Sequence, residues 1–253
     1  MTLFFEELPH PDSPFRRWDA RWKLAALLIA GGCTAILQSL PLAVLAFLAS
    51  LGLAFVARLP VRWWAVRLAA VAPFLALFVL LLPFLVNEPH PLVQWGGISI
   101  SATGIGLALL ILFKALAVLT LMMVLVASGP LPESLHAAHR LGVPGVVIQI
   151  VLLTYRYLFL LINELDRMRI ALRLRGFRNR ASRHSYRTIA HVTGTLLVRS
   201  QEKAERISQA MRSRGFDGQF RSLVEWRTRF ADVAGFLGIV AVFVIFLLGD
   251  LMD

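Results

Sequence analysis

The predicted fold depends on how the stretch VVIQIVLLTYRYLFLLI, residues 146–162, lies relative to a membrane. By length it is nearly a transmembrane helix, because a bilayer core about 30 Å thick requires roughly 20 apolar residues. Gln149, Arg156 and two tyrosines interrupt it, and an arginine cluster follows. If the stretch crossed, that cluster would lie outside, against the positive-inside rule. We therefore predict a helix that lies along or dips into the cytosolic interface and continues into solvent. The cluster comprises Arg167, Arg169, Arg173, Arg175, Arg178, Arg180, Arg183 and Arg187.

The composition of the whole chain indicates a membrane protein. Hydrophobic residues make up 58% of its 253 residues and charged residues only 16%, and the mean hydropathy is +0.71. This exceeds what a soluble core requires. The predicted fold class is all-α, a polytopic membrane protein with about five transmembrane helices and two long cytosolic helices. The predicted spans are 24–40, 41–57, 64–86, 104–127 and 232–249.

The distribution of charge predicts the orientation of these spans. The link 58–67 carries three arginines and two tryptophans, whereas 87–103 has no lysine or arginine. The first link is therefore expected in the cytosol and the second outside. Residues 129–231 hold 18 Lys and Arg against seven Asp and Glu, a surplus equal to the net charge of +11. We predict a membrane domain at 1–128, a cytosolic domain at 129–231 and a final span within 232–253. The protein would be a multi-pass protein of the inner (plasma) membrane, with its N-terminus cytoplasmic and its C-terminus external.

A basic sequence occurs twice in the cytosolic part. DRMRIALRLRGF (166–177) aligns with ERISQAMRSRGF (205–216), and both copies read acid-Arg-x-x-x-Ala-x-Arg-x-Arg-Gly-Phe. Each glycine stands where a helix ends in a left-handed residue, and each phenylalanine where a Schellman motif places its apolar contact. The acids are expected to order the arginines through intrahelical pairs. We call 171–177 and 210–216 the two arginine motifs. Their candidate site residues are Ala171, Arg173, Arg175, Gly176, Ala210, Arg212, Arg214 and Gly215.

Either arginine motif alone is compatible with an ordinary helix end, because the helix dipole favours arginine there. Two matched copies favour docking into two equivalent grooves, since guanidinium forms bidentate bonds that ammonium does not. The sequence itself therefore indicates a paired partner.

The chain resembles the transmembrane T component of energy-coupling factor transporters, above all its cobalt-type CbiQ branch. The matching residues are Arg175-Gly176, Arg214-Gly215 and LPESLHAAHRLGVPG (131–145). In the family motif, alanine directly precedes the arginine. This chain departs from that motif, because Leu174 and Ser213 stand at these positions. The resemblance implies two ABC ATPase subunits docked on the arginine motifs and a separate substrate-capture membrane subunit. It also implies import of a transition-metal ion, with cobalt first and nickel or a vitamin as alternatives.

Other candidate sites are weaker. The sequence has no Gly-x-x-x-x-Gly-Lys-[Ser/Thr], so we expect a non-catalytic subunit whose partners hydrolyse ATP. Glu133, His136 and His139 lack the His-Glu-x-x-His spacing and are interpreted as part of an interfacial helix, so no metal site or cofactor is expected. Lys114 lies within a predicted span, where a structural pairing or snorkelling is the first interpretation. Cys33 is expected to pack as a small hydrophobe.

Two alternatives to a coupling subunit remain open. A membrane enzyme would need a nucleophile–base or metal constellation that the predicted spans lack. A membrane-anchored binder of anionic lipid or nucleic acid would use the arginines and would weaken steeply with salt. Matched helix ends are unnecessary for such binding, and aromatic residues for base stacking are sparse. We therefore expect a lipid bilayer and protein subunits as partners, and no nucleic acid.

Overall fold

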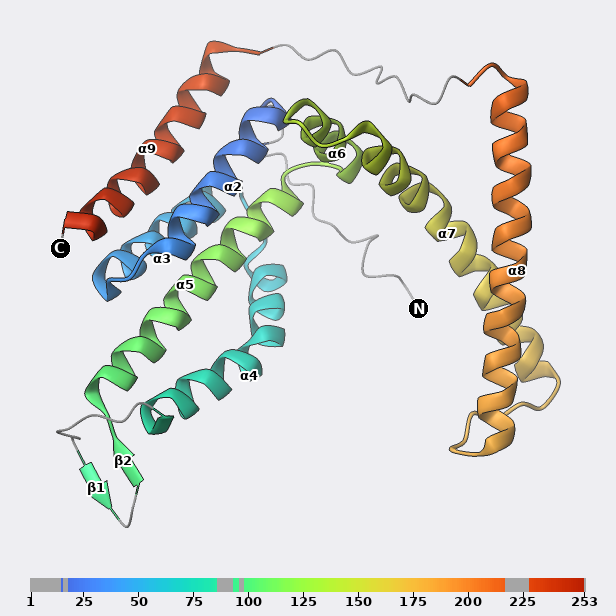
Figure 1. Ribbon diagram of the computed structural model, residues 1–253, viewed down its shortest axis with the longest axis horizontal. Helices are drawn as coiled ribbons and strands as arrows, with labels where there is room; N and C mark the ends of the chain where they lie inside the picture. The colour runs from blue at the N-terminus through green and yellow to red at the C-terminus, as the bar shows by residue number, and fades with distance from the viewer. Residues whose placement is uncertain (1–14, 16–17, 86–92, 96–97, 217–227, 253) are drawn as a thin grey trace. The chain divides into compact units, whose positions relative to one another are not determined.

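Helices make up almost all of the chain that is described by the structure, a computed structural model (Figure 1). It describes residues 15, 18–85, 93–95, 98–216 and 228–252. The predicted all-α class is confirmed, with one small exception: strands β1 and β2 pair antiparallel, Val93 opposite Ile100. The rest of the predicted external segment 87–103 and the start of the chain lie largely outside the described residues. The elements are α2 (Ala20–Ile36), α3 (Leu40–Val56), α4 (Val61–Leu85), β1 (Val93–Trp95), β2 (Ile98–Ile100), α5 (Ala102–Ala127), α6 (Leu131–Arg140), α7 (Gly145–Leu174), α8 (Arg183–Ser213) and α9 (Phe230–Met252).

The chain divides into two compact units. The first consists of residues 1–141 and 225–253, and the second of residues 142–224. The first unit therefore includes α6, which packs against α2. The second unit contains α7 and α8. The domain limits 1–128, 129–231 and 232–253 remain a prediction about sidedness, which these contacts do not address.

The first unit is held together by close packing around α5. Helices α2, α3 and α4 all contact α5, and α2 also packs along α9. Fully buried positions in α2, α3 and α5 are mainly small residues, among them Ala30, Ala46 and Ala117. Small residues allow helix backbones to approach closely, which is the usual way helices associate within a bilayer. Leu27, Leu121 and Phe243 complete the buried core.

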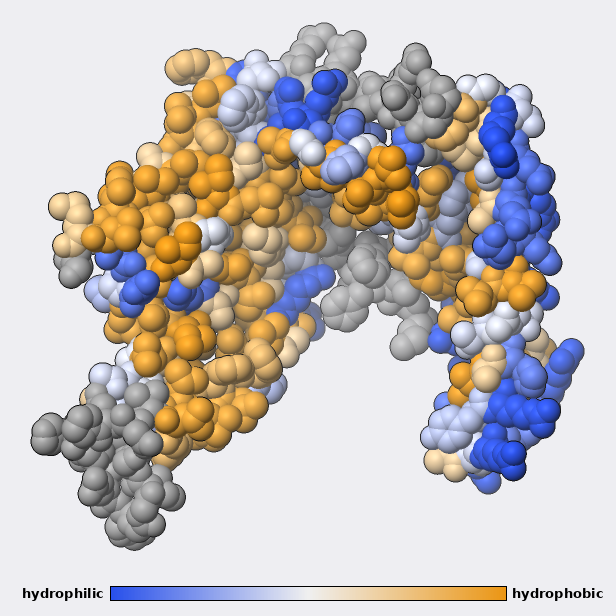
Figure 2. Space-filling view, viewed as in Figure 1, coloured by the Kyte–Doolittle hydropathy of each residue, from blue (hydrophilic) through white to orange (hydrophobic). Residues whose placement is uncertain are grey.

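The outer surfaces of the two units differ in polarity. Hydrophobic residues cover most of the visible face of the first unit, whereas hydrophilic residues run along α8 in the second (Figure 2). On α4, Phe74 and Leu80 are each more than half exposed. Exposed apolar surface of this extent is expected of helices that face lipid.

Four described helices are long and apolar enough to cross a membrane: α4, α5, α7 and α9. Three of them correspond to the predicted spans 64–86, 104–127 and 232–249. Helices α2 and α3 have 17 residues each, about 26 Å at 1.5 Å per residue, and are shorter than a bilayer core. Helix α7 is also long and apolar enough to cross, but arginines follow its apolar part. Its placement at the cytosolic interface remains a prediction.

The turn between α2 and α3 is longer than predicted, because three residues separate the two helices, and side chains of α9 and α5 hold it by hydrogen bonds that form a clasp. Helix α2 ends at Ile36, so the end of the predicted span 24–40 was wrong. Pro41 stands in the first turn of α3. The carboxylate of Asp250 accepts hydrogen bonds from the N–H groups of Gln38 and Ser39, both at 2.7 Å. Lys114 Nζ donates to the carbonyl oxygen of Leu37 at 2.7 Å. Because α2 and α3 are short, the turn between them is expected to lie within the bilayer, where unpaired backbone N–H and C=O groups are costly. These hydrogen bonds pair such groups of the turn. Lys114 thus has a structural partner.

Removing this clasp should weaken the fold. Asp250→Ala deletes the acceptor of two hydrogen bonds, and bonds to charged groups contribute about 1.5–3 kcal/mol each. We expect the free energy of unfolding in detergent to fall by about 2 kcal/mol or more, with a smaller loss for Asp250→Asn, which keeps one carbonyl oxygen. Thermal unfolding measures both changes. An unchanged unfolding temperature for Asp250→Ala would show that the clasp contributes nothing.

Candidate functional site

The first arginine motif forms the end of α7. The helix ends at Leu174, and Gly176 adopts a left-handed φ of 76°. The N–H of Gly176 donates to the carbonyl of Arg173 at 3.0 Å, and the N–H of Phe177 donates to that of Leu172 at 3.0 Å. This pair of bonds defines a Schellman motif. The predicted helix end is confirmed.

The second arginine motif ends α8 in the same way. The helix ends at Ser213, and Gly215 has a φ of 77°. Its N–H donates to the carbonyl of Arg212 at 3.0 Å, and that of Phe216 donates to the carbonyl of Met211 at 3.1 Å. Arg175 and Arg214 therefore occupy the same C-cap position, each followed by the same two Schellman hydrogen bonds. Equivalent surroundings suit equivalent binding partners.

All eight candidate residues are exposed, as a docking surface requires. Within the described residues, no acidic side chain forms an ion pair with an arginine of either motif. The prediction that Asp166 and Glu205 order these arginines was wrong. Asp166 pairs with Arg169 at 3.2 Å, and Glu205 accepts a hydrogen bond from Gln201. The pairs form at spacings of three and four residues, whereas the motif arginines lie seven to nine residues away. The exposed set is Ala171, Arg173, Arg175, Gly176, Ala210, Arg212, Arg214 and Gly215.

The second unit places the two arginine motifs at opposite ends of α8. The first motif is joined to the start of α8 by a short loop, which Ser185 closes by accepting a bond from the N–H of Arg180 at 3.2 Å. Helix α8 then runs for 31 residues, about 46 Å, before it reaches the second motif (Figure 1). The chain thus presents two separated cationic helix ends.

The chain is similar to known proteins along most of its length. Residues 11–226 match the profile of a family described as "CbiQ: Cobalt transport protein". The chain belongs to the CbiQ family. The matched range includes both arginine motifs. Together with the four apolar helices, this membership shows an integral membrane protein.

Three relatives illustrate the CbiQ resemblance. Cobalt transport protein CbiQ of Rhodobacter capsulatus is 33% identical over 215 residues, covering 82% of this chain and 83% of the relative. Cobalt transport protein CbiQ of Salmonella typhimurium is 25% identical over 217 residues, covering 83% and 92%. An uncharacterized protein of Methanocaldococcus jannaschii is 28% identical over 232 residues, covering 88% and 83%.

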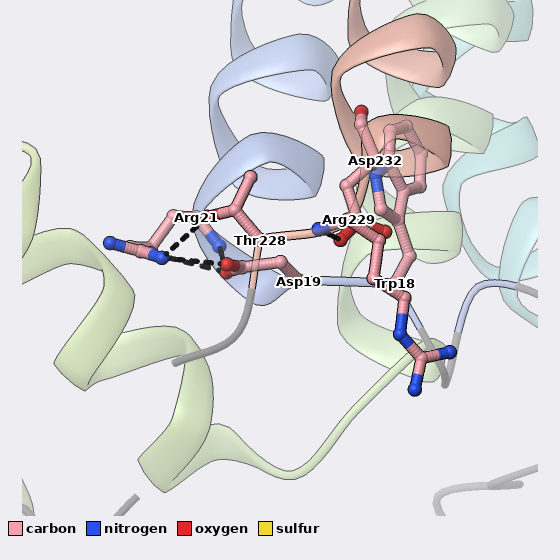
Figure 3. A network of polar contacts seen from close by, with 6 residues as sticks. All are labelled: Trp18, Asp19, Arg21, Thr228, Arg229 and Asp232. Atoms are coloured by element: carbon pink, nitrogen blue, oxygen red, sulfur yellow. Dashed lines mark hydrogen bonds and ion pairs between the residues drawn. The ribbon is translucent and has the colours of Figure 1, made fainter. Parts of the chain in front are cut away.

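In this member of the CbiQ family, a polar network joins the start of α9 to the start of α2 (Figure 3). Trp18 Nε1 donates to the carbonyl of Asp232 at 3.0 Å, and Arg21 Nη2 donates to Thr228 Oγ1 at 3.1 Å. The Trp18 ring lies over Gly235, where a Cβ would come within 3.0 Å of it. Burial raises the pKa of the Asp19 carboxyl, but the hydrogen bonds and charge of Arg21 outweigh this and hold that pKa below its usual value. The network fixes the chain where it returns from the second unit.

Lys23 of α2, which the sequence did not single out, is buried and reaches the turn between α5 and α6. Lys23 is 2% exposed, and its Nζ donates to the carbonyl oxygens of Ser128 at 3.2 Å and Phe15 at 3.4 Å. It therefore satisfies the end of α5 just before α6 begins. Glu133, His136 and His139 lie on α6, and within the described residues no three His, Cys, Asp or Glu side chains are grouped to hold a metal.

Proposed function

We propose that this protein is the transmembrane coupling subunit of an energy-coupling factor transporter that imports cobalt. The observation that carries the proposal is the pair of equivalent, exposed arginine motifs on the two long helices of the second unit. Membership of the CbiQ family and the printed names of the R. capsulatus and S. typhimurium relatives support cobalt as the cargo.

Each arginine motif is suited to binding an acidic groove. Arg175 and Arg214 stand at helix ends held by the same hydrogen bonds, so their backbones are fixed while their side chains are exposed. A fixed backbone reduces the entropy lost on binding. Guanidinium also offers bidentate bonds to carboxylates. Two such ends fit two copies of one partner, which in this proposal are ABC ATPases.

The role of the subunit is mechanical and non-catalytic. The sequence has no phosphate-binding loop for ATP, so ATP hydrolysis belongs to the docked partners. Closure of the ATPase pair would move the two arginine motifs, and α7 and α8 would transmit that motion to the membrane helices. A substrate-capture membrane subunit would receive it within the bilayer.

Gentle detergent extraction tests this assembly. We expect the chain to co-purify with two copies of an ABC ATPase and with another membrane protein, and cells that hold the complex to take up radioactive cobalt in an ATP-dependent way. Recovery of the chain without any ATPase would contradict the proposal.

Orientation gives a separate prediction. With Cys33→Ser as background, single cysteines at positions 100 and 180 should label differently with a membrane-impermeant maleimide. Position 100 should react in intact cells and position 180 only after permeabilisation, because arginine-rich segments stay in the cytosol. Labelling of position 180 from outside would reverse the proposed topology.

A further inference from the structure

A polar junction joins α7 and α8 where they cross in the second unit. Glu164 of α7 accepts a hydrogen bond from Arg199 of α8 on one carboxylate oxygen. Its other oxygen accepts from Arg167 of α7 at 2.6 Å. The Glu164 side chain is only 21% exposed, whereas that of Arg199 is 55% exposed. Among the described residues, Glu164 and Arg199 form the one ion pair found between these helices.

Apolar packing at this crossing is incomplete. A hollow of about 470 Å³ lies beside the junction, lined by Leu161, Leu196 and Ile207 together with Lys203, Arg206 and other residues. The hollow opens to solvent, so the side chains of α7 and α8 do not interdigitate along it as they would in a close-packed interface. The angle between α7 and α8 is therefore not fixed by dense packing, and the position of the charged junction becomes decisive.

Small changes of this angle would displace both arginine motifs. Glu164 precedes Arg175 by 11 residues, and Arg199 precedes Arg214 by 15 residues, or about 16 and 22 Å along the helices. A rotation of about 10° between the helices would thus move Arg175 by roughly 3 Å relative to α8, or equally Arg214 by roughly 4 Å relative to α7. Such a shift breaks a hydrogen bond, which requires donor and acceptor within about 3.2 Å.

We infer that Glu164, held by Arg167 and Arg199, is the pivot that sets the angle between α7 and α8 and thereby the spacing of the two arginine motifs. Glu164 is a positioning residue in this account. Its significance for transport rests on the proposed function, but the pivot itself is a property of the second unit. Exposed ion pairs add little to stability, so variants at the pivot should fold and differ in geometry.

Distance measurements between spin labels test the pivot directly. Labels at Asn179 and Gln209, which are exposed beside the two motifs, are read by double electron–electron resonance on the full chain with Cys33→Ser. Wild type should give one narrow distance peak. Glu164→Gln and Arg199→Gln should each broaden this peak or shift it. Exchanging the charges, Glu164→Arg with Arg199→Glu, should restore the narrow peak.

Glu202→Gln is the matched control. It also removes one acid of the second unit, but Glu202 pairs with Arg206 within α8, so the distance distribution should stay as in wild type. If Glu164→Gln leaves the distribution unchanged, or Glu202→Gln alters it equally, the pivot is overturned. These distances are recorded without ATPases, so they test the pivot independently of the proposed function. The proposed function would fail in a different experiment, if variants of Arg175 and Arg214 bound the ATPases normally.

Discussion

Changing both Arg175 and Arg214 to glutamate is expected to abolish binding of the ATPase pair, and either change alone to weaken it at least about thirtyfold. Truncating one member of a buried charge pair costs about 2–5 kcal/mol, and each 1.4 kcal/mol corresponds to a tenfold change in affinity. Substitution by glutamate should cost more binding free energy than truncation, because it places a negative charge in an acidic groove. Cobalt uptake should fall with binding, since a helix end outside its groove transmits no motion. Surface plasmon resonance with purified ATPase gives the affinities.

Arg180→Glu and Arg183→Glu are the matched controls for this experiment. They change the net charge by the same amount and are exposed, but they lie beyond the end of α7. If the helix end is the docking site, the two controls should each lose less than about threefold in affinity, because exposed charges outside the groove are weakened by salt screening over about 8 Å. Equal damage by the controls would show that diffuse charge, and not the motif, binds the ATPase.

Gly104→Ala is expected to destabilise the first unit more than any other single Gly→Ala substitution in it. A Cβ at Gly104 would lie 2.8 Å from Cα of Pro83 and 3.0 Å from the carbonyl oxygen of Leu82. Both atoms belong to the backbone of α4 and do not move aside as a side chain does. Overpacking of this kind typically costs about 1–3 kcal/mol and at times more. We expect a loss of about 2–3 kcal/mol in the free energy of unfolding, seen as a lower unfolding temperature in detergent and lower yield.

Gly106→Ala supplies the control on the same helix. Apart from the local backbone of α5 itself, no atom lies within 4 Å of a Cβ at Gly106, and alanine favours helix over glycine by about 1 kcal/mol. This variant should be as stable as wild type or more so. Equal stability of the two variants would mean that α4 and α5 do not approach closely at Gly104.

Features set by neighbouring residues were predictable from the sequence. The ends of α7 and α8 follow from Gly-Phe after a basic turn, because only glycine adopts the left-handed conformation at low cost. Continuation of the apolar stretch 146–162 into the first arginine motif is likewise confirmed, since α7 runs without a break from Gly145 to Leu174. These outcomes depend on contacts within about six residues of chain.

Features set by distant residues were not predictable. Asp250 and Ser39 are 211 positions apart, Lys23 and Ser128 are 105 apart, and Glu164 and Arg199 are 35 apart. No local pattern indicates such pairs, because they form only when helices pack. The end of α2 was missed for the same reason, since the turn owes its position to Asp250 and Lys114. The β1–β2 pairing had a local signal, the Gly-Gly between VQW and ISI, which is typical of hairpins.

Native mass spectrometry of the complex extracted from membranes tests the central claim most directly. The account predicts two ATPase copies on each wild-type chain and on the Arg180→Glu, Arg183→Glu double control. It predicts none on the Arg175→Glu, Arg214→Glu double variant, with the chain still folded and inserted. A double motif variant that still carries two ATPases would contradict the account, because the two arginine motifs would then be ordinary helix ends.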